Sequence, residues 1–178
     1  MLSRSREMRS MDKTRRLTLM AMLTAASLII FIVEAQLPPL LPIPGVKLGL
    51  ANLITLTAMV ILGRREAGAI LLCRIVLGSV FAGGVSGLLF SIAGGLLSYL
   101  VMCLLKKAFP GKLLWVLSVF GAIAHNVGQL AVAVLISGTP KLALYYGPAL
   151  LAAGILTGAF TGLAAMFLVK ALSKLKKS

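Results

Sequence analysis

Long apolar runs, separated by short polar breaks, extend along almost the whole chain. A run of about 20 apolar residues is long enough to cross the hydrocarbon core of a bilayer as a helix. The pattern therefore predicts an all-α, polytopic membrane protein with six transmembrane helices, the second of them short for a full crossing. We expect these helices over residues 17–33, 48–62, 67–82, 84–105, 113–136 and 142–169.

The segment between the first two predicted helices is rich in proline. Pro38, Pro39, Pro42 and Pro44 are four of the seven prolines in the chain. Proline has no amide proton and restricts the residue before it, so a helix cannot continue through this segment. We expect a stiff loop here.

Basic residues are unevenly distributed between the two ends of the predicted helices. With the N-terminus on the inner side, the N-terminal tail holds six basic residues, the two inner loops hold two and three, and the C-terminal tail holds four. The outer segments hold only Lys47 and Lys141. Cytoplasmic segments of membrane proteins carry an excess of lysine and arginine, so we expect both termini in the cytoplasm. Residues 1–16 and 170–178 are then basic tails of one transmembrane domain, residues 17–169.

The composition agrees with a membrane protein and excludes several other classes. Apolar residues make up 60% of the chain and charged residues 12%, with a mean hydropathy of +1.04, whereas soluble domains are about 45–50% apolar and about 25% charged. Disordered and disulfide-rich chains do not fit either. The net charge of +14 reflects topology and attraction to anionic lipid, so we expect no nucleic-acid partner.

The residues that common enzyme mechanisms require are missing. Diphosphate chemistry needs clustered aspartates to hold magnesium, but Asp12 in the N-terminal tail is the only aspartate. One histidine cannot form a zinc site with Cys73 and Cys103, which we expect to be small buried residues inside apolar helices. No acid is expected near His125 to complete a hydrolytic triad. We therefore predict a binding protein that is not an enzyme and has no metal or cofactor.

Polar residues inside the apolar runs are candidates for a binding site, because ionisable groups in a membrane are costly and usually functional. At about 1.5 Å of rise per residue, Arg74 lies roughly 10–12 Å and His125 roughly 18 Å from the inner helix ends. The other candidates lie at similar depth or further outward, which predicts a cavity that opens outward. The predicted substrate-binding residues are Glu34, Lys47, Asn52, Arg74, His125, Asn126 and Gln129.

Structural alternatives exist for some of these residues. Glu34 and Lys47 could pair across the proline-rich loop, and His125 with Asn126 could form an interhelical hydrogen-bond cluster. The Arg74 side chain could reach the inner interface. However, a guanidinium group cannot lose its proton, and Glu34 is expected to lie too far outward to neutralise it. We therefore expect a ligand or lipid head group to supply the missing negative charge.

Small residues spaced four apart allow helices to approach closely in a membrane. Gly154, Gly158 and Gly162 form such a row in the last helix, and the fourth helix carries a similar row of glycine and serine. We expect both rows to pack within the bundle. Ala21 and Ala25 in the first helix have the same spacing and are further candidates for close packing.

Three segments carry a resemblance to known membrane proteins: residues 16–26, PGVKLGLANLITLTAMVILGRREAGAI (44–70) and GAIAHNVGQL (121–130). They resemble the bacterial Gx transporter family, also called heptaprenyl diphosphate synthase component I. The first two are also similar to the substrate-binding S components of energy-coupling-factor transporters. No substrate signature of that second group is present.

The S-component resemblance implies a six-helix, multi-pass protein of the bacterial cytoplasmic membrane that captures a small, anionic or amphipathic molecule from outside. A transmembrane coupling protein with two ATPases would then drive its release inside, and Ala21 and Ala25 would dock on the coupling protein. The synthase name implies an alternative, a noncatalytic membrane partner of a heptaprenyl diphosphate synthase that binds a prenyl diphosphate or a quinone product. A structural scaffold is the third alternative, but it would leave Arg74 and His125 unexplained.

Overall fold

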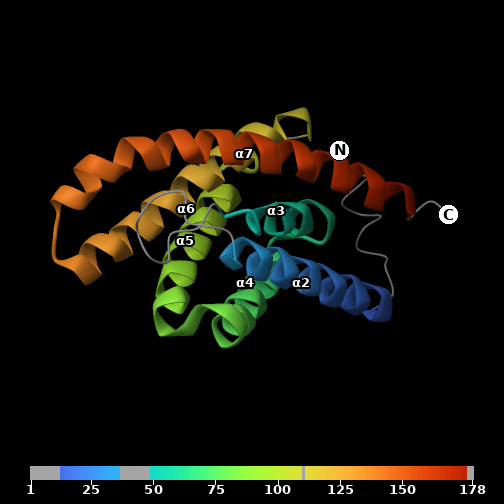
Figure 1. Cartoon of the computed structure of the whole chain (residues 1–178). Coiled ribbons are helices and arrows are strands. Elements are labelled where there is room, and N and C mark those ends of the chain that lie inside the picture. Colours follow the sequence, from blue (N-terminus) through green and yellow to red (C-terminus); the bar gives the residue numbers. More distant parts are fainter. Residues whose placement is uncertain (1–12, 37–48, 110, 176–178) are drawn as a thin grey trace.

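The computed structural model describes residues 13–36, 49–109 and 111–175 of the chain. Every regular element within these residues is helical, as Figure 1 shows. In chain order the elements are α2 (Lys13–Gln36), α3 (Asn52–Ile61), α4 (Arg64–Gly78), the π-helix η2 (Ser79–Gly83), α5 (Gly84–Leu105), the 3₁₀ turn η3 (Gly111–Leu113), α6 (Leu114–Ser137) and α7 (Lys141–Leu175).

The all-α, membrane-type fold is confirmed, whereas six full crossings are not. Four helices, α2, α5, α6 and α7, are long and apolar enough to cross a membrane. The 15 residues of α4 continue without a break into the five residues of η2, and 20 helical residues extend for about 30 Å. By contrast, the 10 residues of α3 extend for only about 15 Å, half of a typical hydrocarbon core.

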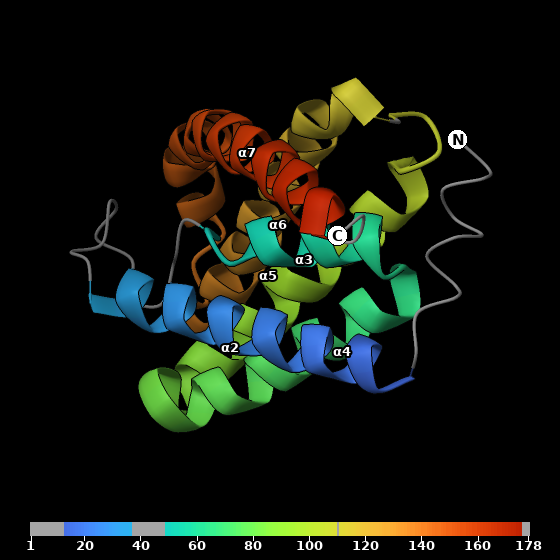
Figure 2. The ribbon, with the colours of Figure 1, turned by 90° about the vertical axis from the view of Figure 1, so that its right-hand side faces the viewer.

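The short helix α3 occupies the centre of the molecule. It contacts each of the other five α-helices, and Figure 2 shows it between α7 on one side and α2 with α4 on the other. Seven of its ten residues are buried, among them Asn52 and Thr55. A helix that is covered on all sides is expected to be apolar all round, so the polar side chains of α3 need partners inside the protein.

Helices α6 and α7 are the most closely packed pair, and glycines make this possible. A Cβ atom on Gly158 or Gly162 would lie 2.5 Å from the Cα atom of Val119 or Trp115. The hydroxyl groups of Ser118 and Thr161 form a 3.0 Å hydrogen bond across the same interface. The predicted packing role of the glycine row in α7 is confirmed.

The row of small residues in α5 packs only in part. Gly94 and Gly95 are buried against His125 and Leu71, whereas Gly84 at the start of the helix is exposed and a Cβ atom on it would have nothing within 4 Å. The expectation for the two cysteines is also corrected, because Cys73 is exposed and Cys103 is half-buried. The side of α4 that carries Cys73 faces outward beside Leu72 and Val76, since the buried side of that helix holds Arg74.

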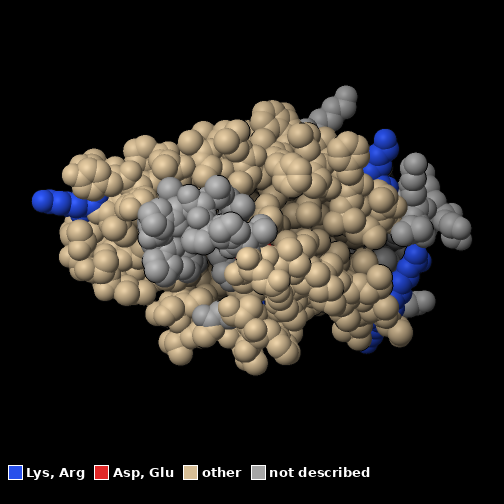
Figure 3. Space-filling view, viewed as in Figure 1, with Lys and Arg blue, Asp and Glu red and all other residues tan. Residues whose placement is uncertain are grey.

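The surface has an apolar flank and one basic end. Large apolar side chains are exposed along several helices, for example Val80, Val85, Leu104, Leu135 and Leu156. Figure 3 shows lysine and arginine side chains gathered at the end where α2 begins and α7 ends, and another at the opposite end, where α7 begins. A membrane protein requires this separation of charge. Which end faces the cytoplasm stays a prediction.

Candidate functional site

Five helices place polar side chains around one small cavity inside the protein, which we call the Arg74 cluster. The cavity has a volume of about 10 Å³, which is room for about one water molecule. Most of the predicted substrate-binding residues meet here, although they lie far apart in the sequence. The lining residues are Phe31, Glu34, Gly49, Ala51, Asn52, Arg74, Ser91, His125 and Gln129.

Arg74 is one of the largest fully buried side chains, with 2% of its surface exposed. It therefore does not reach the inner interface. Its guanidinium carbon lies 5.4 Å from the centre of the Phe31 ring, a favourable cation–π distance. Gly78, one turn further along α4, makes room for this ring, because a Cβ atom there would lie 2.7 Å from it. Among the described residues, the Nε and Nη2 atoms of Arg74 have no hydrogen-bond partner.

Glu34 lies in the same cluster, so the expectation that no acidic residue reaches the depth of Arg74 was wrong. Glu34 and Arg74 line the same small cavity, which brings their opposite charges near each other. The depth estimate counted only backbone rise along upright helices and left out the reach of two long side chains. A ligand is therefore not needed to balance the charge of Arg74. The proposed pairing of Glu34 with Lys47 lies outside the described residues.

Glu34 also holds the start of the half-length helix α3. Its carboxylate accepts hydrogen bonds from the backbone N–H groups of Gly49 (2.6 Å) and Leu50 (3.1 Å). The N-terminus of a helix carries a partial positive charge and attracts anions. The start of α3 therefore adds to the positive field of Arg74, and the Nδ2 atom of Asn52 is a further buried donor without a hydrogen-bond partner within the described part of the chain.

Two glycines make room for the imidazole ring of His125. A Cβ atom on Gly94 of α5 would lie 2.9 Å from Nδ1, and one on Gly49 would lie 3.0 Å from Cδ2. Gly49 has a φ of +76°, which side chains other than glycine rarely adopt. Gln129, one turn after His125, lies on the same face of α6 and is fully buried, with 1% of its surface exposed.

Asn126 does not belong to the cluster. Its Nδ2 atom donates a 2.7 Å hydrogen bond to the carbonyl oxygen of Leu150 in α7. One residue along a helix turns the side chain by about 100°, so Asn126 faces α7 while His125 faces α5. It connects the two helices instead of lining the cavity.

The other predicted residues lie elsewhere. Ala21 and Ala25 are exposed on α2, so they take no part in the close packing of the described bundle. The predicted site did not include Phe31, Ser91 or Gly94. Ser91 and Gly94 were predicted as packing residues of the fourth helix but not as neighbours of the site, and nothing marked Phe31 among the many apolar residues of α2.

The fold and the cluster define a class of protein: a helical, membrane-type bundle with a buried, charged polar site. The chain belongs to the heptaprenyl diphosphate synthase component I family, whose model matches residues 23–168. This confirms the family resemblance, whereas the similarity to S components is not shown. Searches of curated proteins and of solved structures found no match. A component of a synthase is compatible with a chain that is not itself an enzyme.

Proposed function

We propose that this chain is a membrane subunit that binds a small, anionic or amphipathic molecule at the Arg74 cluster and works with a separate energising module. The observation that supports this most strongly is the shortage of acceptors in the cluster. Three buried N–H groups, Nε and Nη2 of Arg74 and Nδ2 of Asn52, have no hydrogen-bond partner among the described residues.

A ligand that accepts hydrogen bonds from these buried donors would remove the energetic cost of leaving them without partners. A buried donor without a partner costs about 1–3 kcal/mol, and more when the group is charged. A carboxylate or phosphate group offers several acceptor oxygens and can bind both nitrogens of a guanidinium group at once. The half-length helix α3 adds the partial charge of its N-terminus. In transporters, interrupted helices at mid-membrane serve anionic substrates in this way.

The cavity is too small for such a ligand as it stands, since about 10 Å³ holds one water molecule. Binding therefore requires the helices around the cluster to move apart, and the present structure corresponds to a closed state. In the proposed topology both termini lie in the cytoplasm of a bacterial cell, and the cluster opens toward the outside.

Partner docking would use the exposed face of α2. Ala21 and Ala25 lie between the exposed side chains of Leu17 and Ile29 at intervals of four residues, so all four share one face. A coupling protein with ATPases would pack its own helix against this face, where the alanines permit a close approach.

A second function is favoured by the family name. The chain would be a noncatalytic membrane subunit of a polyprenyl diphosphate synthase, and the cluster would bind a prenyl diphosphate or a quinone product. Both functions place an acceptor-rich group beside Arg74, so ligand and partner must be tested separately.

The test uses the full chain, purified in a mild detergent, and measures thermal unfolding with vitamins, flavins, quinones and prenyl diphosphates. We expect at least one compound to stabilise the wild-type protein, and Arg74→Lys to weaken this effect because lysine lacks the second nitrogen. Asn126→Ala is the control, since Asn126 is equally buried but lies outside the cluster. Equal stabilisation of Arg74→Lys and wild type would remove Arg74 from the site, and a lack of any stabiliser would contradict ligand binding.

Co-purification then separates the two functions. Capture of a coupling protein with ATPases, abolished by Ala21→Trp or Ala25→Trp, supports transport. Capture of a prenyl synthase, together with stabilisation by a prenyl diphosphate or a quinone, supports the second function.

A further inference from the structure

A second cavity lies at the basic end of the molecule. It has a volume of about 750 Å³, in the range of typical small-molecule sites. The start of α2, the end of α3, the turn into α4 and the residue after α5 form its walls. We call it the basic pocket, and its lining residues are Arg16, Met59, Val60, Ile61, Leu62, Gly63, Arg64, Arg65, Glu66 and Lys106.

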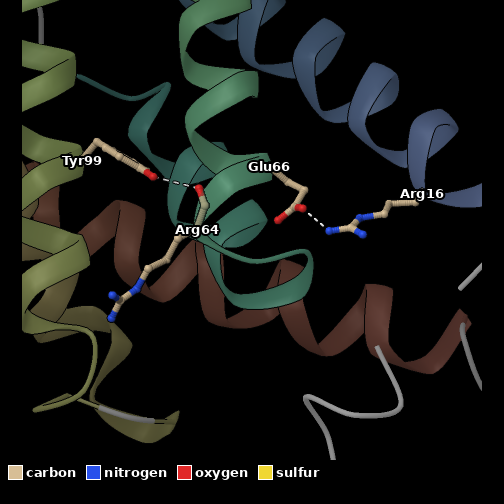
Figure 4. Close-up of polar contacts among 4 residues, drawn as sticks. All are labelled: Arg16, Arg64, Glu66 and Tyr99. Atoms are coloured by element: carbon tan, nitrogen blue, oxygen red, sulfur yellow. Dashed lines mark hydrogen bonds and ion pairs between the residues drawn. The ribbon is translucent and has the colours of Figure 1, made fainter. Parts of the chain in front are cut away.

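The charges in the basic pocket do not balance. Arg16 forms an ion pair with Glu66, the only acidic side chain among the described residues of the lining. Figure 4 shows that Arg64 points away from this pair. In the part of the chain that the structure describes, no ion pair neutralises Arg64, Arg65 or Lys106. Three positive charges therefore share one cavity with no ion-pair partner among the described residues.

Hydrogen bonds hold two of these cations in place. The hydroxyl group of Tyr99 donates a 2.8 Å hydrogen bond to the carbonyl oxygen of Arg64 (Figure 4), which fixes the first residue of α4. Lys106 donates from Nζ to the carbonyl oxygen of Met59 near the end of α3. Burial and the nearby charge of Arg64 both lower the pKa of Lys106, as expected for cations that are held together without an anion.

Helix α4 adds a further positive element. It begins at Arg64 with no side chain capping its first N–H groups, and these groups have no partner within the helix. Gly63 precedes it with a φ of +125°, and a Cβ atom there would lie 2.8 Å from the Glu66 carboxylate. The pocket thus combines a helix N-terminus with three cations and an apolar wall from Val60 to Leu62.

We propose that the basic pocket binds the phosphate or diphosphate group of an anionic amphiphile. The cations and the N-terminus of α4 hold the phosphate oxygens, and the apolar wall contacts the chain attached to them. Basic pockets between membrane helices recognise phosphate head groups in this way. The source of the group is either a membrane phospholipid or a soluble phosphate compound. This site is separate from the Arg74 cluster and does not depend on the proposed function.

The test compares two triple variants of the full chain that remove the same charge. The pocket variant neutralises the three cations of the basic pocket that have no ion-pair partner among the described residues: Arg64→Gln/Arg65→Gln/Lys106→Gln. The exposed-lysine variant neutralises three lysines outside the pocket: Lys107→Gln/Lys141→Gln/Lys170→Gln. Binding of inorganic pyrophosphate and of phosphatidylglycerol is measured by calorimetry and native mass spectrometry in neutral detergent.

We expect the pocket variant to lose about tenfold or more in affinity, because each cation near an anionic group contributes roughly 1 kcal/mol. The exposed-lysine variant should lose less than about twofold. Binding of pyrophosphate alone identifies a soluble source, and binding of the lipid alone identifies a head group. Equal losses in both variants, or no binding of either probe by the wild type, would overturn the proposal.

Two single variants keep the outcome interpretable. Lys106→Arg preserves the charge and should retain binding, which separates loss of charge from loss of fold. Arg74→Lys shows at which site the probes bind. A loss of binding in the pocket variant but not in Arg74→Lys assigns the probe to the basic pocket, whereas the reverse pattern would overturn this proposal and leave the Arg74 site standing.

Discussion

The Arg74 cluster and the basic pocket both contain arginine, but the two sites hold it under opposite conditions. In the cluster Arg74 is 2% exposed, shares its cavity with Glu34, and has too few acceptors for its N–H groups. In the pocket the cations border a cavity of about 750 Å³, and among the described residues they outnumber the one acid, Glu66. The described cluster therefore lacks hydrogen-bond acceptors, whereas the described pocket has an excess of positive charge.

This difference predicts different responses to mutation and to salt. Buried charges interact through a medium of low dielectric constant and are screened little, while charges beside water are screened within about 8–10 Å at ordinary ionic strength. Changes in the cluster should therefore alter stability, and changes in the pocket should alter affinity for anions and its salt dependence.

The largest effect is expected from Arg74→Met, which removes the cation that shares a cavity with the buried carboxylate of Glu34. Removing one of two interacting buried charges costs up to about 3–5 kcal/mol. The double variant Arg74→Met/Glu34→Gln should lose less stability than the single variant, because both interacting charges are then removed together. Thermal unfolding in detergent measures both. If the loss of stability in the double variant, relative to wild type, equals the sum of the losses in Arg74→Met and Glu34→Gln alone, the two side chains do not interact.

Close packing around His125 gives the second prediction. Gly94→Ala would place a Cβ atom 2.9 Å from the imidazole ring and should destabilise the protein by about 1–3 kcal/mol. Gly87→Ala on the same helix has open space and should be neutral or slightly stabilising, because alanine favours helix. Equal unfolding temperatures for the two variants would mean that the cluster is not tightly closed.

Sequence alone was sufficient to find the chemistry of the cluster but not its geometry. Arg74, His125 and Gln129 are conspicuous because polar groups are rare in apolar helices. Their neighbour Asn126 was misplaced because one residue along a helix changes the face by about 100°. Glu34 was assigned to the outer surface because a sequence gives depth along one helix, not the direction in which two side chains reach.

The fold, like the cluster, could be predicted only in part from the sequence. The long helices follow directly from apolar length, whereas the predicted proline-rich loop lies outside the described residues. The central position of α3 could not be predicted, because it depends on how five other helices surround it. The basic pocket was also missed, since Arg64, Arg65 and Lys106 were interpreted only as signals of topology.

Glu66→Gln tests the charge balance of the basic pocket. The change removes the only acid among the described lining residues and releases Arg16, so affinity for pyrophosphate should rise by about twofold to fivefold at low salt. Stability should change by less than about 1 kcal/mol, because a partly exposed ion pair contributes little. Calorimetry at 0.05 M and 0.5 M salt would check both the gain and its loss on screening. Unchanged or weaker binding would contradict the charge imbalance.

The smallest effect is expected from the ionisation of Lys106, whose pKa is lowered from 10.5 by burial first and then by the charge of Arg64. A lysine with a lowered pKa in the folded state binds fewer protons there than in the unfolded state, so this group makes the protein more stable as the pH rises toward 10.5. The gain should stay below about 0.5 kcal/mol, because Lys106 is only half-buried and solvent screens it. Lys106→Arg stays charged and should lack the gain, whereas Lys107→Arg should keep it. The free energy of unfolding is measured between about pH 7 and about pH 10 for the wild type and both variants. The same pH dependence in all three proteins would show that no neighbouring cation lowers the pKa of Lys106.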